Sequence, residues 1–155
     1  MTQPSRILIV EARFYEDIAD ELAKGAVAVL DETGEHYERV AVPGVFETPA
    51  AVRFAIRSME MKAVTQGGYS GFIVLGCVIR GETDHNEYIS RSAIQALMDL
   101  TLTYSISLGL GVLTCNTREQ ALERASVEGR NTGAKAARAC LSMMELKKDL
   151  FLVAR

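Results

Sequence analysis

The chain has 155 residues, 48% of them apolar, and its 17 Lys and Arg against 20 Asp and Glu give a net charge of −3. This length predicts a single domain, 1–155, whose core is large enough to fold without disulfides or a structural metal. The mildly acidic balance argues against a nucleic-acid-binding protein, which usually presents a basic face.

Short apolar runs alternate with helical patterns along the chain. In chain order, the predicted elements are a strand over 6–10, a helix over about 14–34, a strand over 37–42, a helix over about 49–64, a strand over 72–79, a helix over 84–104, a strand over 110–115 and helices over about 117–126 and 132–147. Strands separated by helices of this length predict βαβ units, a parallel sheet and an α/β fold. The fully apolar third strand is typical of a sheet covered on both faces.

The cysteines and the apolar runs indicate the cellular setting. Cys77, Cys115 and Cys140 are odd in number and widely spaced, and no C-x-x-C occurs, so we expect buried free thiols and no zinc site. The polar start of the chain lacks the apolar region of a signal peptide, and the longest apolar run is too short to cross a bilayer. We therefore expect a soluble cytoplasmic protein that does not contact membranes.

In open parallel sheets, ligands bind outside the carboxyl ends of the strands. The rule selects four segments, which are 11–14, 44–47, 76–85 and 116–117. The third, GCVIRGETDH, is the most informative. Asp84 and Glu87 resemble a capping box with Asp84 as the N-cap, which would place His85 in the first turn of a helix. The positive end of the helix dipole there favours a neutral imidazole, which can take or give a proton.

The backbone N–H groups that precede this helix are expected to face an anion: Gly81, Glu82 and Thr83. A solvated helix start with an incidental histidine is the alternative. The segment 42–49, VPGVFETP, predicts a stiff loop in which Glu47 binds a hydroxyl or an N–H, or else a plain strand-to-helix turn. Phe14 either stacks on a flat ring or begins the apolar face of the first helix. Arg124 either pairs with a phosphate or forms an ordinary surface ion pair.

Taken together, these segments resemble the lumazine synthase family. The matching pieces are ARF at 12–14, VPGVFETP at 42–49 and GCVIRGETDH at 76–85, with weaker pieces EQALERA at 119–125 and NTG at 131–133. They occur in the family's order over nearly the whole chain. The resemblance implies a flavodoxin-like, three-layer α/β/α sandwich with a four-stranded parallel sheet.

The resemblance also implies a reaction. The family condenses 5-amino-6-(D-ribitylamino)uracil with 3,4-dihydroxy-2-butanone 4-phosphate to 6,7-dimethyl-8-ribityllumazine, phosphate and water, without a metal or an organic cofactor. Carried over, Phe14 would stack on the pyrimidine, while Val78 and Ile79 would contact the uracil edge. The ribityl chain would lie against three residues of the second loop: Val45, Phe46 and Glu47.

The phosphate would be bound by Arg124 together with the turn that precedes the long helix: Gly81, Glu82 and Thr83. His85 would shuttle protons. Three positions differ from the common family pattern. Thr132 stands where many members have a lysine, and Leu110 stands where many have an aromatic residue that a neighbouring subunit contributes. Asn86, directly after the histidine, stands where an aromatic residue is common.

The sequence also allows two alternative functions. A non-catalytic lumazine or flavin carrier on the same scaffold fits the missing lysine and aromatic, whereas His85, Arg124 and the complete phosphate turn favour the enzyme. A flavodoxin-like signalling domain would need an acidic pair after the first strand, and only Glu11 is there.

The resemblance implies sites shared between the subunits of a five-fold ring. Independently, the apolar residues of the helix 84–104 cover more than one narrow stripe, so this helix needs burial on several sides. We therefore expect a homopentamer. The stretch SVEGRN at 126–131 matches the turn of shell-forming relatives only at its last residue, which favours a free pentamer over a decamer or an icosahedral shell.

Overall fold

A computed structural model describes residues 5–62 and 67–152. In chain order its elements are β1 (Arg6–Ala12), α1 (Glu16–Thr33), β2 (Tyr37–Val42), the 3-10 turn η1 (Val45–Glu47), α2 (Thr48–Glu60), β3 (Tyr69–Ile79), α3 (His85–Tyr104), β4 (Leu108–Cys115), α4 (Arg118–Ala125) and α5 (Thr132–Asp149). The predicted alternation of strands and helices is confirmed.

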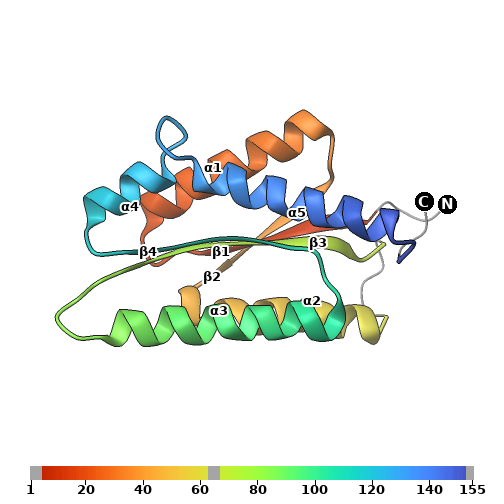
Figure 1. Cartoon of the computed structure of the whole chain (residues 1–155), viewed down its shortest axis with the longest axis horizontal. Helices are drawn as coiled ribbons and strands as arrows, with labels where there is room; N and C mark the ends of the chain where they lie inside the picture. The colour runs from red at the N-terminus through yellow and green to blue at the C-terminus, as the bar shows by residue number, and fades with distance from the viewer. Residues whose placement is uncertain (1–4, 63–66, 153–155) are drawn as a thin grey trace.

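The strands form one parallel sheet in the order β2-β1-β3-β4. Helices α1, α4 and α5 cover one face of the sheet, and α2 and α3 cover the other (Figure 1). This is the three-layer α/β/α sandwich that the resemblance implies. Each face of the sheet has its own apolar cluster, one built around α1 and α5 and the other around α2 and α3. Among the helices of the described part, none is both long and apolar enough to cross a membrane.

Element ends differ from the predictions by a few residues. β3 begins at Tyr69 and β4 at Leu108, because pairing with neighbouring strands extends them past their apolar runs. α2 ends at Glu60, short of the predicted 64, and residues 63–66 lie outside the described part. Leu150 and Phe151 are exposed, and the rest of the tail, 153–155, also lies outside it.

Within the single chain, α3 is only narrowly covered. It buries Ser90, Ala93 and Leu97, whereas Tyr88 and Leu102 are exposed. The broad apolar face predicted for this helix is thus left largely open. A helix with this pattern gains further stability when a second surface covers it.

Candidate active site

A pocket of about 540 Å³ lies beyond the carboxyl ends of β1 and β3, the edge that the strand-end rule selects. Its walls are the turn after β1, the loop 43–47 and the start of α3. Nine of the twelve predicted site residues line it: Phe14, Val45, Phe46, Glu47, Val78, Ile79, Gly81, Thr83 and His85. Phe14 and Phe46 are 72% and 67% exposed, so the pocket's aromatic walls are largely uncovered in one chain.

The loop 43–47 is seated on the sheet at a glycine. A Cβ atom on Gly76 would lie 2.7 Å from the Val45 side chain and 2.9 Å from Ala12, so only glycine lets η1 pack this closely. The hydroxyl of Thr48 donates to the Val45 carbonyl over 2.8 Å and closes the turn. This packing leaves the neighbouring Phe46 facing the pocket.

Glu47 fits both roles that the sequence allows, a residue of a strand-to-helix turn and a polar group of the site. It stands at the junction of η1 and α2, as a plain strand-to-helix turn requires, and it also lines the pocket. Its Oε2 accepts a hydrogen bond from the Gly44 N–H over 3.0 Å. The carboxylate is therefore oriented by its own loop before any ligand arrives.

Asp84 is the N-cap residue of α3, as predicted, but the predicted capping box is wrong. The Asp84 side chain makes no capping bond, because its backbone (φ −78°, ψ 12°) lacks the extended conformation that N-cap residues usually have. The Thr83 hydroxyl instead accepts from the His85 N–H over 3.3 Å, and Glu87 binds Arg91 over 3.0 Å. His85 is still the first residue of α3, as predicted.

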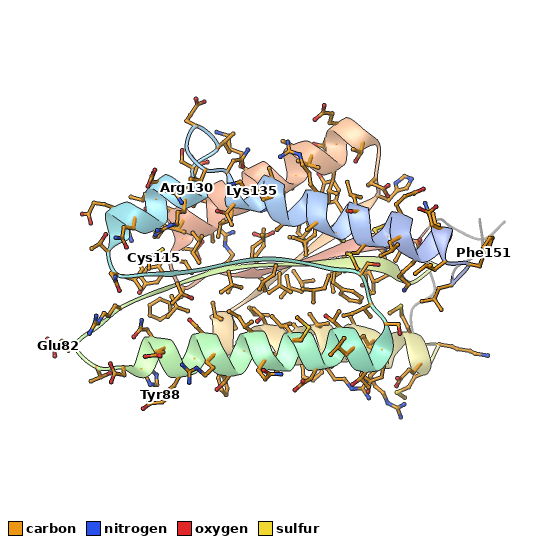
Figure 2. All side chains as sticks on the ribbon, viewed as in Figure 1. Glu82, Tyr88, Cys115, Arg130, Lys135 and Phe151 are labelled. Atoms are coloured by element: carbon orange, nitrogen blue, oxygen red, sulfur yellow. The ribbon has the colours of Figure 1, made fainter. Side chains whose placement is uncertain are left out.

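Three predicted site residues do not line this pocket: Glu82, Leu110 and Arg124. Glu82 lies at the tip of the turn and points away from the molecule (Figure 2). Leu110 is 40% exposed on β4, an edge strand of the sheet. Arg124 lies on α4, where its Nη1 is 3.4 Å from Cys115 Sγ. One chain therefore does not bring Leu110 or Arg124 to its own pocket.

The remaining departures from the family pattern also have defined places. The Thr132 hydroxyl donates to the Arg124 carbonyl over 2.8 Å, so it joins the start of α5 to α4. Asn86 lines the pocket beside His85.

Five further lining residues were not predicted: Tyr15, Pro43, Gly44, Cys77 and Ile89. Ile89 follows His85 by one helical turn, a spacing that could have identified it. All three cysteines are buried and free, as predicted. Burial raises the pKa of the Cys77 thiol to about 12, so this thiol is uncharged and unreactive at neutral pH. In the described ranges, no three His, Cys, Asp or Glu residues are grouped to hold a metal ion.

Comparison with known proteins agrees with this geometry. The family model for 6,7-dimethyl-8-ribityllumazine synthase matches residues 4–148. Proteins of that name from Paramagnetospirillum magneticum and Agrobacterium fabrum are 43% and 45% identical over 148 and 150 residues, covering 96% and 97% of this chain and 98% and 99% of theirs. 6,7-dimethyl-8-ribityllumazine synthase 1 from Rhodopseudomonas palustris is 48% identical over 146 residues, or 94% of this chain and 88% of its own. The chain belongs to the 6,7-dimethyl-8-ribityllumazine synthase family and is a transferase-type enzyme of riboflavin biosynthesis.

Proposed function

We propose that the pocket condenses 5-amino-6-(D-ribitylamino)uracil with 3,4-dihydroxy-2-butanone 4-phosphate to give 6,7-dimethyl-8-ribityllumazine, phosphate and water. The observation that carries the proposal is the meeting of an aromatic wall, an oriented carboxylate and a histidine at a helix start in one pocket. The 5-amino group of the uracil would attack the ketone to form a Schiff base, and water would leave. Phosphate would then be eliminated, and attack of the ribitylamino nitrogen on the second carbonyl, with loss of another water, would close the ring.

The wall formed by the first two loops fits the uracil substrate. Phe14 is exposed toward solvent and can stack on a flat ring. Val78 and Ile79, at the end of β3, line the pocket and would contact the edge of that ring. Along the neighbouring loop, Val45, Phe46 and Glu47 would hold the ribityl chain, whose hydroxyls can donate to the Glu47 carboxylate.

The turn 81–83 and the start of α3 fit the phosphate and the proton transfers. The N–H groups of the turn 81–83 precede α3, and a helix start favours an anion. His85 begins that helix and is exposed to the pocket, which is suitable for moving protons between the reacting nitrogen, the leaving phosphate and water. Arg124 would complete the phosphate site.

We further propose a homopentamer in which Arg124 and Leu110 reach the pocket of a neighbouring chain. Three observations support this assembly. Both residues lie outside their own chain's pocket, and α3 leaves apolar side chains exposed. Within residues 5–62 and 67–152, β4 is an edge strand with no strand paired to its outer side. We expect a free pentamer, with sites that exist only where two subunits meet.

A cytoplasmic location is supported by the cysteines. All three are buried and unpaired, as is usual where thiols are kept reduced.

Turnover separates this proposal from a non-catalytic carrier, an alternative that none of the relatives' names favours. The purified protein, given both substrates, should form a lumazine, followed by its absorbance, and release one phosphate for each lumazine. Omission of the butanone phosphate should abolish both signals. Tight binding of added lumazine with no turnover of the two substrates would contradict the proposal and support a carrier.

A further inference from the structure

A network of charges surrounds the residue before Phe14. The mostly buried Arg13 side chain donates from Nη1 to Glu11 Oε1 over 2.7 Å and from Nε to Glu16 Oε2 over 2.9 Å. It also binds Asp20, in the second turn of α1. A single guanidinium thus connects the end of β1 to the first two turns of the next helix and spans the turn that carries Phe14.

The network does not need Arg13 in order to neutralise its buried carboxylate. Glu11 is 3% exposed, and Arg39 of β2 binds it with both ends of its guanidinium, Nε to Oε2 over 2.6 Å and Nη2 to Oε1 over 3.0 Å. Without Arg13, this two-point pair would still leave both Glu11 oxygens with a charged hydrogen-bond donor. The distinctive contribution of Arg13 is therefore its connection to α1.

The ring of Phe14 has little other support. It is 72% exposed, and it makes an edge-on contact with the ring of the adjacent Tyr15, with centroids 5.0 Å apart. The Arg13 N–H donates to the Val42 carbonyl over 3.1 Å, which fixes the turn against the loop 43–47. Burial alone would lower the pKa of Arg13, but its hydrogen bonds with Asp20, Glu16 and Glu11 raise that pKa above its ordinary value. The Arg13 side chain, here called the tether between β1 and α1, therefore stays charged.

We propose that Arg13 is a positioning residue that acts through Phe14: it holds the turn 13–15 so that the aromatic ring is already placed for stacking when the heterocycle binds. The inference rests on the proposed function of the pocket. Without the tether, the ring would have to be ordered during binding, and that ordering weakens affinity for the heterocycle. The butanone phosphate, bound at the turn 81–83, would be little affected.

A double-mutant cycle tests whether the effect passes through Phe14. The probe is 6,7-dimethyl-8-ribityllumazine, whose fluorescence reports its binding. Arg13→Met should weaken binding by about 3- to 10-fold, the effect expected from ordering one side chain and its turn. In a Phe14→Ala background the same change should have no further effect. An equal loss in both backgrounds would overturn the proposal and make Arg13 a purely structural residue.

Arg118→Met is the matched control. Arg118 forms an ion pair with Asp17, in the first turn of α1, but this ion pair does not bridge the turn that carries Phe14. Its removal should therefore leave the affinity for the lumazine at the wild-type value. A loss equal to that of Arg13→Met would contradict a specific tether. Arg13→Lys retains the charge but reaches fewer carboxylates, so it should recover part of the affinity, and it can replace Arg13→Met in the cycle if the latter does not fold.

Steady-state kinetics give an independent readout. Arg13→Met should raise KM for the uracil substrate and leave kcat and the KM for butanone phosphate nearly unchanged. A fall in kcat with both KM values unchanged would overturn the proposal. Failure of the proposed function looks different, because the wild-type protein itself would then show no turnover.

Discussion

Replacing His85 by alanine is expected to slow turnover at saturating substrate by about 10²-fold, the lower end of what a general acid–base group contributes. The lower end is expected because His85 is exposed at the start of α3, where water can carry part of the proton traffic. The pH dependence of the rate should also change, because a group that donates and accepts protons during turnover is gone. Steady-state kcat measured across pH checks both effects.

The chain offers a matched control for this substitution. His36, the other histidine, is exposed just before β2, at the opposite end of the strands from the pocket. His36→Ala should leave kcat and its pH profile unchanged. A His85→Ala enzyme with the wild-type rate at every pH would remove His85 from the mechanism.

Replacing Arg124 by alanine is expected to weaken the phosphate-bearing substrate far more than the uracil. A charge-assisted contact contributes about 1.5–3 kcal/mol, so the apparent affinity for butanone phosphate should fall by roughly one to two decades. Binding of the uracil substrate should be almost unaffected, because the aromatic wall is intact. The two KM values, measured separately, give the comparison.

Arg130 provides the control for Arg124. It is exposed just beyond the end of α4, and its Nε lies 3.8 Å from Glu123 Oε1. Arg130→Ala should leave both KM values near those of the wild type. Equal losses for the two substrates in Arg124→Ala would show that this arginine supports the fold or the interface instead of the phosphate.

The sequence predicts the layers of this fold well, because apolar periodicity records which side of each element is buried. It predicts the start of β3 less well: Tyr69 belongs to the strand through its pairing with Arg6, a contact between distant parts of the chain that leaves no local pattern. The Asp84 cap fails for a related reason. Residue type allows the cap, but the backbone angles at that turn decide it.

The pocket shows a similar division. The strand-end rule and the motifs place Phe14, Glu47 and His85 at one edge, and the structure brings them together. The seating of Val45 on Gly76 depends on a close approach between β3 and a loop some 30 residues earlier, which no local pattern reveals. Nor does the sequence of one chain show that Arg124 lies outside its own pocket, because that depends on where α4 packs.

Mixing two defective variants tests the shared site most directly. In a ring assembled at random from equal amounts of His85→Ala and Arg124→Ala chains, about a quarter of the interfaces join an intact His85 to an intact Arg124 of the neighbour.

Differently tagged variants would be co-expressed, purified through both tags and sized by light scattering, where five times the 16.9 kDa chain mass is expected. At low butanone phosphate, activity should rise to about a quarter of the wild-type value, far above either variant alone. Activity no higher than the average of the two parents, in mixed rings of the expected mass, would contradict a site built by two chains.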